Sequence, residues 1–526
     1  MSWNLADLFE AVADNVPTRE AVVCAEADGT TTRSTYAQLD RRANRLAHVL
    51  AGRGIGPGDR VGLQLANGNE YLEAMLACFK LRALPVNVNY RYVAEELRHL
   101  FEVSGTALVI HEPDLTPAID EVRDELPLLR STLVRGDDYE AALAVAPTSR
   151  PVAERSGDDR YVLYTGGTTG RPKGVVWRHE DIFHAALSGA SPLRPGLSTI
   201  EEVRAHAPAG RARCLVASPL IHGTGHWMAL STLFRGGTVI VMRARGLDAG
   251  RLWEVAASEA ASWLVIVGDA FARPLVDALE GDTACTARAG TVTVIMSGGS
   301  TLSPSVKSDL LRLLPTVVLV DGFGASETGG QGRMVSAPGA DVDGAGSFVP
   351  GEGTTVLDDD LRPLSPGDGR TGWLARRGHI PVGYLGDPES STLTFPEVDG
   401  VRWAVPGDRA TIAANGNVVV FGRGSTSINS GGEKVHPEEV ESALRSHPEV
   451  FDAVVVGAPD PRWGEVITAI VQPRPGRAPC LPDLADHCRR TMAAFKVPRR
   501  LLLVDEVRRS PSGKPDYRWA RSVIEG

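Results

Sequence analysis

Residues 164–175 read YTGGTTGRPKGV and directly follow the apolar run Tyr161-Val162-Leu163. The glycines let consecutive backbone N–H groups turn inward, the threonines add hydroxyl donors, and Lys173 adds a positive charge. This stretch is therefore predicted to cradle phosphate. It is not a Walker A loop, because no Gly-Lys-Ser/Thr follows the required spacing. A Gly/Thr-rich loop on its own can be an ordinary surface turn, but the full pattern is much more specific.

Helices and strands alternate on the N-terminal side of this stretch. Apolar residues at helical spacing predict a helix over 36–50, a Gly-Pro-Gly-Asp turn follows at 56–59, and residues 61–65 read as a strand. The same order continues with a helix over 70–80, a strand over 84–88, a helix over 94–102 and a strand over 107–110. This order favours parallel sheets covered by helices.

Two changes of pattern divide the rest of the chain. From about Gly351 to Phe421, short alternating runs with frequent Gly and Pro predict a small β-barrel or sandwich. After residues 422–425 the pattern becomes that of a compact α+β unit, with helices predicted over 437–445 and 481–494 and strands over 453–456, 466–471 and 501–504. We therefore expect an N-terminal domain of residues 1–422 and a C-terminal domain of residues 423–526.

Composition excludes several classes of protein. The chain has 526 residues, 43% hydrophobic and 23% charged, which indicates a globular protein of more than one domain. Its 55 Lys and Arg against 65 Asp and Glu disfavour a nucleic-acid-binding surface. The first residues do not read as a signal peptide, and no apolar run approaches the roughly 18 residues of a membrane span. Six scattered cysteines suggest no disulfide framework and no zinc finger. We expect a cytoplasmic protein.

A second motif, DGFGASET at 321–328, follows the apolar run 317–320. An aromatic ring on a Gly-flanked turn can stack on a purine, and a nearby carboxylate can hold a Mg²⁺ ion that bridges phosphates. Phe323 and Glu327 are the candidates. The alternative is a turn at a strand end with a core phenylalanine. The Gly pair in residues 297–300 can likewise be a binding segment or a plain turn.

Two weaker motifs follow in order. Pro406-Gly407-Asp408 precedes Gly422-Arg423, and a Ser-Gly-Lys turn places Lys514 near the C-terminus. A lone Gly-Asp is usually a hairpin turn, and a single surface lysine is usually solvated. These motifs therefore gain weight only from their order along the chain.

With these motifs in this order, the chain resembles the adenylate-forming superfamily of acyl-CoA synthetases, non-ribosomal peptide adenylation domains and firefly-type luciferases. The resemblance covers essentially the whole chain. The runs 85–92, 177–181 and 512–520 resemble actinobacterial acyl-CoA ligases that act on bulky acids such as steroid side chains. The fold implied is α/β, with a large N-terminal domain of two α/β subdomains plus a β-barrel, and a small mobile α+β C-terminal domain.

The resemblance also implies roles for individual residues. The catalytic residues would be Lys514, Glu327, His222 and Thr165, with Glu327 as the Mg²⁺ ligand. The residues expected to bind ATP are Thr165, Gly166, Gly167, Thr168, Thr169, Lys173, Gly298, Gly299, Ser300, Asp321, Gly322, Phe323, Gly324, Ser326, Asp408, Arg423 and Lys514.

Two further sites are implied, for the acyl group and for CoA. The acyl pocket would be lined by His222, Trp227, Gly268, Phe271, Gly298 and Phe323, although a lone histidine can equally be a core residue. Amino-acid-activating relatives carry Asp just after the position of His222, whereas this chain has Gly223, which favours a substrate that is not an amino acid. After rotation of the C-terminal domain about residues 423–425, Gly431, Gly432 and Glu433 would lie beside the pantetheine arm of CoA.

The resemblance thus predicts an ATP-dependent carboxylic acid:CoA ligase that uses Mg²⁺ and acts on a small-molecule acid. Two alternatives stay open: an enzyme that makes acyl-AMP for a partner protein, and a nucleotide-binding pseudoenzyme. The first is kept open by Ser425 and Asn429, because relatives usually carry Asp or Lys at the former and often Lys at the latter. The sequence leaves open which acid is used, whether this chain performs the CoA half-reaction, the pathway and the oligomeric state, with a homodimer among the options.

Overall fold

A four-stranded parallel sheet is built from the alternating elements near the N-terminus. Its order is β4-β3-β5-β6, with bounds β3 Arg60–Gln64, β4 Leu84–Asn87, β5 Thr106–His111 and β6 Ser131–Val134. The accompanying helices are α1 Leu5–Asn15, α2 Tyr36–Gly52, α3 Asn69–Leu81, α4 Ala94–Ser104, α5 Thr116–Arg123 and α6 Asp137–Val145. The predicted helices over 36–50, 70–80 and 94–102 are confirmed. Helix α2 begins where it does because Thr35 and Gln38 form a capping box.

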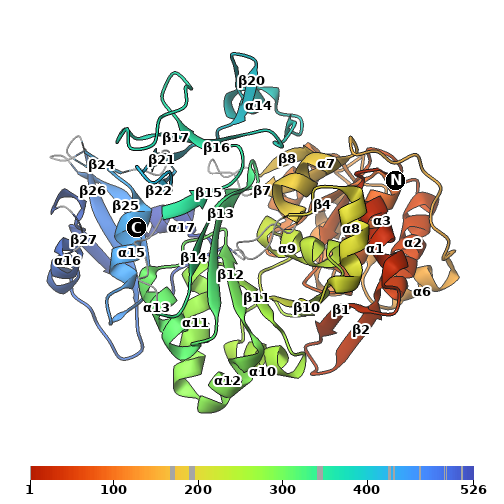
Figure 1. Ribbon diagram of the computed structural model, residues 1–526, viewed down its shortest axis with the longest axis horizontal. Helices are drawn as coiled ribbons and strands as arrows, with labels where there is room; N and C mark the ends of the chain where they lie inside the picture. The colour runs from red at the N-terminus through yellow and green to blue at the C-terminus, as the bar shows by residue number, and fades with distance from the viewer. Residues whose placement is uncertain are drawn as a thin grey trace.

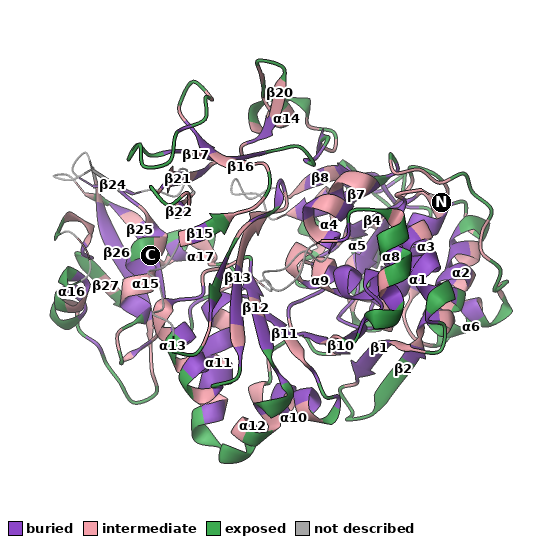
Figure 2. Ribbon diagram, in the orientation of Figure 1, coloured by how far each residue is buried: buried purple, intermediate pink, exposed green. Residues whose placement is uncertain are grey.

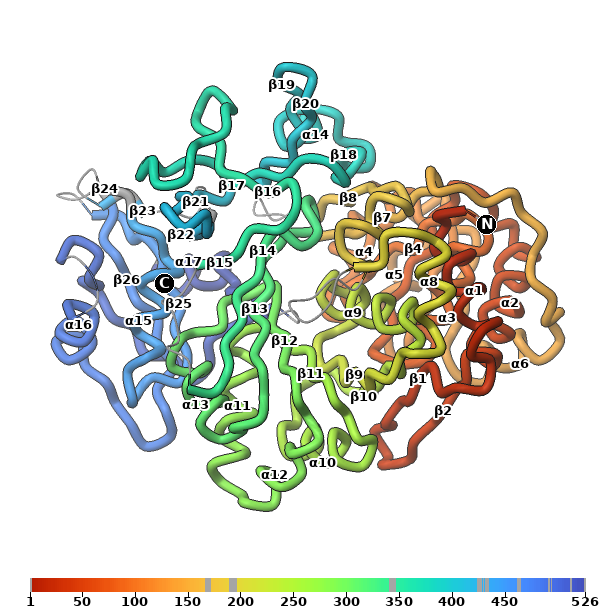
Figure 3. The backbone as a smooth tube through the Cα atoms, viewed as in Figure 1, coloured from red at the N-terminus to blue at the C-terminus, as the bar shows by residue number. Residues whose placement is uncertain are grey.

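The computed structural model describes residues 2–165, 172–188, 196–339, 347–423, 428–430, 433–460, 464–490, 492, 494–510 and 513–525. Figure 1 shows the C-terminal residues at the opposite end of the molecule from helices α1–α3, with a long sheet between them. The backbone trace in Figure 3 follows the same progression from one end of the molecule to the other.

The long sheet has the order β19-β20-β17-β21-β22-β15-β14-β13-β12-β11-β9-β10-β1-β2. Its central strands from β13 to β1 pair in parallel, and they are mainly buried in Figure 2, except that the carboxyl end of β13 is intermediate. Their bounds are β1 Glu20–Ala25, β2 Thr31–Thr35, β9 Arg213–Val216, β10 Thr238–Met242, β11 Trp263–Ile266, β12 Val294–Gly298 and β13 Val318–Ala325. The helices between them are α8 Ile200–His206, α9 Gly223–Phe234, α10 Ala249–Ser258, α11 Gly268–Gly281, α12 Thr283–Arg288 and α13 Pro304–Leu313.

The strands in the region for which the sequence predicts a β-barrel or sandwich pair antiparallel. They are β16 Thr354–Leu357, β17 Gly372–Arg377, β19 Glu397–Val398, β20 Val401–Ala404, β21 Asp408–Ile412 and β22 Val418–Arg423. They continue into the long sheet through β15 Ser347–Pro350 and β14 Gly329–Ser336. A separate three-stranded sheet contains β7 Arg160–Thr165, β8 Lys173–Arg178 and β18 Gly383–Tyr384, flanked by α7 His179–Ile182 and α14 Pro388–Thr394. The phosphate-loop motif therefore joins two antiparallel strands, β7 and β8.

The C-terminal domain, residues 428–525, is a smaller α+β unit with its own hydrophobic core. Its elements are β23 Ile428–Ser430, β24 Glu433–Val435, α15 Pro437–Arg445, β25 Val450–Asp460, β26 Gly464–Pro473, α16 Leu481–Arg489, β27 Arg500–Leu503 and α17 Tyr517–Glu525. The predicted helix over 437–445 is confirmed. The helix predicted over 481–494 ends earlier, because Ala494–Lys496 forms a separate 3₁₀ turn.

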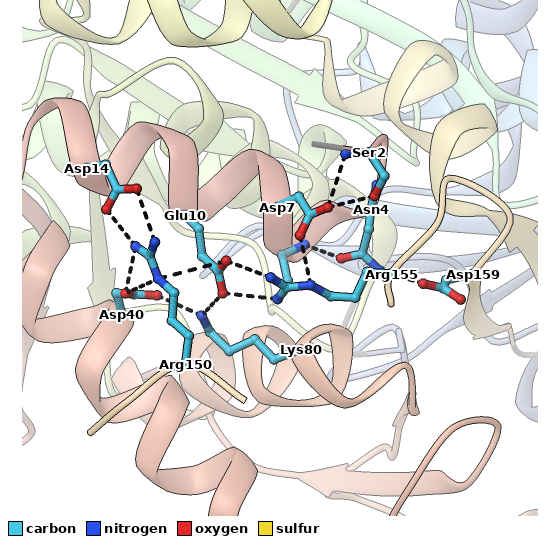
Figure 4. A network of polar contacts seen from close by, with 11 residues as sticks. Ser2, Asn4, Asp7, Glu10, Asp14, Asp40, Lys80, Arg150, Arg155 and Asp159 are labelled. Carbon is cyan, nitrogen blue, oxygen red and sulfur yellow. Dashed lines mark hydrogen bonds and ion pairs between the residues drawn. The ribbon is translucent and has the colours of Figure 1, made fainter. Parts of the chain in front are cut away.

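A network of buried charges ties the N-terminal helices together (Figure 4). The ammonium of Lys80 on α3 donates to Glu10 of α1 at 2.5 Å and to Asp40 of α2 at 2.7 Å, and its side chain is fully buried. Arg155 also donates to Glu10, and Arg150 to Asp40. Three helices and the segment that leads into β7 therefore share one set of ion pairs.

The cysteines and the helices bear on what composition predicts about disulfides and membrane spans. None of the six cysteines, all of which lie in the described part of the chain, forms a disulfide, and five of them are buried. Among the helices in the described part of the chain, none has the length and apolar character needed to cross a membrane.

Candidate active site

One large cavity, of about 2430 Å³, lies where the carboxyl ends of β11, β12 and β13 face the C-terminal domain. Ligands of open α/β sheets bind at this edge of the strands. Most of the predicted site residues line the cavity: Thr165, Lys173, His222, Trp227, Gly298, Gly299, Ser300, Asp321, Gly322, Phe323, Gly324, Ser326, Glu327, Asp408 and Lys514. Residues far apart in the sequence are thus brought to one place.

Some predicted residues do not line this cavity. Phe271 packs instead against the hydrophobic core formed by α10–α13 and the long sheet. Gly268 lies on the wall behind the cavity, where its N–H donates to Ser297 Oγ and a Cβ would meet the Thr301 carbonyl oxygen at 2.5 Å. Gly166, Gly167, Thr168, Thr169, Gly431, Gly432 and the side chains of Arg423 and Glu433 lie outside the described residues.

The turn between β13 and β14 presents an aromatic ring and a carboxylate to the cavity. Phe323 packs on Phe348 with ring centroids 5.4 Å apart. Glu327, only 6% exposed, accepts a hydrogen bond of 3.0 Å from the Tyr384 hydroxyl. Buried Arg376 fixes the turn by donating to the carbonyl oxygens of Thr328 and Gly330 at 2.7 Å. Since Phe323 stays half-buried, a ring face remains available for a flat ligand.

Tyr384 is a site residue that the sequence analysis missed. Besides holding Glu327, its ring lies 5.1 Å from the Lys173 ammonium, which also donates to Ser390 at 2.6 Å. The strand pairing of β18 with β8 brings it beside the end of the phosphate loop. The available signal was the Gly- and Pro-rich run 383–388, which resembles a binding turn but has no spacing that identifies it. One tyrosine thus connects the carboxylate side of the cavity to its cationic side.

Asp321 is held inside the protein by a charged partner on α13. Its carboxylate forms a buried ion pair with Lys307 at 2.8 Å. Burial raises the pKa of Asp321, against the opposing effect of Lys307. This pair anchors the end of β13 to α13 and so supports the turn that carries Phe323.

His222 precedes α9 and is neutral at physiological pH. Burial, with smaller contributions from the charge of Lys514 and from His226, lowers the pKa of His222 to about 3. Its Nε2 atom is buried without a hydrogen-bond partner in the described structure. The first turn of α9, which follows His222, is held by hydrogen bonds inside the protein. His226 contacts the Leu220 carbonyl oxygen and the Tyr161 hydroxyl, and Trp227 donates to the same hydroxyl. An unsatisfied polar atom of this kind suits an oxygen of a bound ligand.

The C-terminal domain supplies Lys514 to the same cavity. Ser510 and Lys514 exchange two hydrogen bonds, and Gly513 between them has φ +73°. Arg509 secures this turn, since it donates to the Gly513 carbonyl at 2.8 Å and pairs with Asp452 at 2.6 Å. Lys514 lines the same cavity as His222, and its positive charge contributes to the lowered pKa of that histidine.

Asp408 lies at the start of β21 opposite Arg423, and another acidic residue lies nearby. Burial, followed by the negative charges of Glu441 and Asp408, raises the pKa of Glu438 on α15 to about 8. Asp408 is 8% exposed and lines the cavity. An acidic group in this position can accept hydrogen bonds from hydroxyl groups of a ligand.

A single cavity that combines an aromatic platform, a buried carboxylate and cations from two domains is suited to a nucleoside triphosphate and its reaction at phosphorus. Fold and site therefore define an adenylate-forming enzyme. The chain belongs to the AMP-binding enzyme family: the model of that family matches residues 9–384, and the AMP-binding enzyme C-terminal domain matches residues 439–514. Together with relatives that match it over its full length and are named as CoA ligases, this membership makes the chain an AMP-forming acid:CoA ligase.

Known proteins are similar over the full length of the chain. A 3-oxocholest-4-en-26-oate--CoA ligase of Rhodococcus rhodochrous is 43% identical, with 99% of this chain and 96% of the relative covered. A medium/long-chain-fatty-acid--CoA/3-oxocholest-4-en-26-oate--CoA ligase of Mycobacterium tuberculosis is also 43% identical, with coverage of 100% and 97%. The crystal structure of the anthranilate CoA ligase AuaEII with anthranoyl-AMP has a TM-score of 0.85 at 23% identity, with coverage of 99% and 97%.

Proposed function

We propose that this enzyme joins a bulky carboxylic acid, of the steroid side-chain or medium to long fatty type, to CoA through an acyl-AMP intermediate. The observation that carries the proposal is the mixed lining of the cavity. The lining includes the charged side chains of Lys173, Glu327 and Lys514, and it also includes the apolar side chains of Trp227, Met228, Trp263 and Met296. Relatives named for a steroid acid support the same substrate class.

The first half-reaction brings two anions together. A carboxylate oxygen of the acid forms a bond to the α-phosphorus of ATP, and the bond from that phosphorus to the bridging oxygen of pyrophosphate breaks. No protein nucleophile is needed, so catalysis consists of neutralising charge and positioning the reactants. Lys514 is proposed to meet the α-phosphate, and Lys173 with the loop that starts at Thr165 to hold the leaving pyrophosphate.

Glu327 is the proposed residue for holding Mg²⁺. The donor set fits, because Mg²⁺ usually takes one or two protein carboxylates and completes its shell with phosphates and water. The described residues contain no cluster of three or more acidic, His or Cys side chains that could hold a metal ion without substrate. When bound, the ion would neutralise phosphate charge. Tyr384 would keep one oxygen of Glu327 fixed by its hydrogen bond.

His222 and Phe323 are proposed to orient the reactants. A neutral His222 can donate a hydrogen bond from its buried Nε2 to the carboxylate of the acid. Because this histidine carries no positive charge, it would not make the carboxylate a weaker nucleophile. Phe323 would stack on adenine, and Asp408 would accept hydrogen bonds from the ribose hydroxyls. Gly223, which follows His222, offers no carboxylate for an amino group, in keeping with an acid that is not an amino acid.

In the second half-reaction the CoA thiolate would attack the acyl carbonyl, and AMP would leave. We propose that residues 431–433 serve this step after the C-terminal domain, starting at residue 423, changes its orientation.

We also propose a cytoplasmic location, where ATP and CoA are available. A homodimer is the proposed oligomeric form, and light scattering would test it. The two-domain division at 422/423 is supported by the separate hydrophobic core of residues 428–497.

The test uses purified protein, ATP, Mg²⁺ and a panel of steroid, terpenoid and fatty acids, with acyl-AMP and acyl-CoA followed by mass spectrometry. Acyl-CoA from a bulky acid is the expected product. Acyl-AMP that persists in the presence of CoA would instead identify an enzyme that passes its product to a partner. Neither product from any acid would contradict the proposal.

Replacing Tyr384 by Phe is expected to raise the Mg²⁺ concentration needed for half-maximal adenylation by roughly 10-fold, since a hydrogen bond to a charged group contributes about 1.5–3 kcal/mol. ATP–pyrophosphate exchange at increasing Mg²⁺ measures this. Tyr92→Phe is the control, because Tyr92 also lines the cavity but does not contact Glu327. An unchanged Mg²⁺ dependence in Tyr384→Phe would contradict the positioning of Glu327 by this tyrosine.

A further inference from the structure

The first turn of α11 contacts the C-terminal domain beside the Lys514 turn. A Cβ at Gly513 would lie 3.2 Å from the Val267 carbonyl oxygen and 3.3 Å from Ala270 Cβ, so the turn is seated directly on this part of the N-terminal domain. Asp269 lies between these two contact points in the sequence. Figure 1 shows α11 next to α15, as the hydrogen bonds from α11 to Arg445 require.

Asp269 makes two buried hydrogen bonds that face in different directions. Its Oδ1 accepts from the Ser303 N–H at 2.8 Å, within the N-terminal domain. Its Oδ2 accepts from Arg445 Nε at 3.0 Å, across the domain interface, and both side chains are no more than 6% exposed. Because the first bond fixes the orientation of the carboxylate, the second oxygen is presented to Arg445 in one geometry.

Arg445 is in turn connected to the element that carries Lys514. Glu441, one turn earlier on α15, lies 3.5 Å from Arg445 and accepts a hydrogen bond of 3.2 Å from the Tyr517 hydroxyl. Tyr517 begins α17, directly after the Lys514 turn. Arg273 adds a second contact from α11, since it donates to the Arg445 carbonyl at 3.0 Å. Continuous polar contacts therefore run from Asp269 to the helix that follows Lys514.

We propose that Asp269 is a positioning residue for the adenylation step, because its ion pair with Arg445 holds the C-terminal domain in the orientation that brings Lys514 into the cavity. This inference rests on the proposed function, in which Lys514 serves the first half-reaction. Asp269 lines the cavity, but its two carboxylate oxygens are taken up by Ser303 and Arg445, so the role proposed for it is to position and not to react. Its loss should therefore reproduce the pattern of a Lys514 variant, with adenylation slowed and the thioester step retained.

A second ion pair between the same two domains provides a matched control. Asp277, at the other end of α11, pairs with Arg474 at 3.2 Å, and the two side chains are 35% and 29% exposed. Exposed pairs are screened by water and contribute little. Asp269→Asn and Asp277→Asn are the same chemical change on one helix, and only the first affects a buried contact.

The experiment measures each half-reaction separately. Single-turnover acyl-AMP formation from acid and ATP reports the first, and acyl-CoA formation from pre-made acyl-AMP and CoA reports the second. Asp269→Asn keeps an oxygen for the Ser303 N–H and is expected to slow the first by roughly 10-fold to 100-fold, the effect of losing a hydrogen bond to a charged group. The second should stay close to the wild-type rate, and Asp277→Asn should leave both unchanged.

Two results would overturn the positioning role alone: equal loss of both half-reactions in Asp269→Asn, or an equal effect of Asp277→Asn. Wild-type protein that forms no acyl-AMP would instead overturn the proposed function, and the positioning role with it. If Asp269→Asn does not fold, Gly513→Ala provides the second variant, because its methyl group would push the Lys514 turn away from Val267 while leaving the ion pair intact. The same selective loss of adenylation is expected, and unchanged adenylation contradicts the proposal.

Discussion

Lys514→Ala is expected to lower the rate of acyl-AMP formation by roughly 100-fold to 1,000-fold, the range found when one fixed donor to a developing charge is removed. The reason is electrostatic. Acid carboxylate and triphosphate repel each other, and Lys514 is the cation that the C-terminal domain brings to the side of the cavity where His222 lies. Formation of the thioester from pre-made acyl-AMP should continue close to the wild-type rate. Single-turnover measurement of both half-reactions checks this.

Arg508→Ala is the control for this experiment. Arg508 is an exposed cation six residues before Lys514 and does not line the cavity, so its removal should leave adenylation unchanged. A Lys514→Ala enzyme that loses both half-reactions equally would contradict a role confined to the first. An enzyme that keeps both would place the neutralising charge elsewhere.

Lys80→Met is expected to destabilise the protein by about 3 kcal/mol, because it leaves the buried carboxylates of Glu10 and Asp40 with less compensation. Arg155 and Arg150 still contact these carboxylates, which keeps the loss at the low end of the usual range. The measurement is urea unfolding, and a lower midpoint at unchanged slope is expected.

The same network makes stability depend on pH. Burial raises the pKa of Glu10, but Arg155 and Lys80 outweigh this effect and lower the pKa overall. The contribution of Glu10 is therefore present at neutral pH and lost as the pH falls through that lowered pKa.

The control for Lys80 is an exposed ion pair in the same part of the molecule. Arg130 pairs with Asp59 at 2.6 Å, and the side chains are 46% and 29% exposed. Arg130→Met should cost less than about 1 kcal/mol. Adding Glu10→Gln and Asp40→Asn to Lys80→Met should recover part of the loss, since the buried negative charges are then gone. Equal urea midpoints for Lys80→Met and Arg130→Met would contradict this expectation, because the buried network would then contribute no more to the free energy of unfolding than an exposed ion pair.

Local sequence patterns predicted most of the elements because their signals are short-range. Helix α2 has an apolar stripe, and α15 has Pro437 at its first position and acidic residues in its first turn. The helix predicted over 481–494 was too long, because Ala494 belongs to a separate 3₁₀ turn from which Phe495 packs against the core of the C-terminal domain. Periodicity reports that a residue is buried, and it does not report which backbone geometry buries it.

The candidate site was predicted where motifs carry it and missed where tertiary contacts carry it. The turn around Phe323 and Glu327 and the turn around Lys514 have spacings that stand out in the sequence. Tyr384, Arg376 and Asp269 do not, because their partners lie between 34 and 176 residues away. Phe271 was expected in the acyl pocket by resemblance, but it faces the core on α11.

The part of the C-terminal domain that carries Lys514 would also affect how long the proposed acyl-AMP intermediate survives in the cavity. A mixed anhydride is prone to hydrolysis, and one side of its cavity is formed by residues 509, 510 and 514–517 of the C-terminal domain. The lysine that we propose to speed activation is thus carried by the same surface that would keep bulk solvent away from the intermediate. Any loosening of that surface would make the enzyme slower and more wasteful at once, since ATP would be consumed for free acid instead of product.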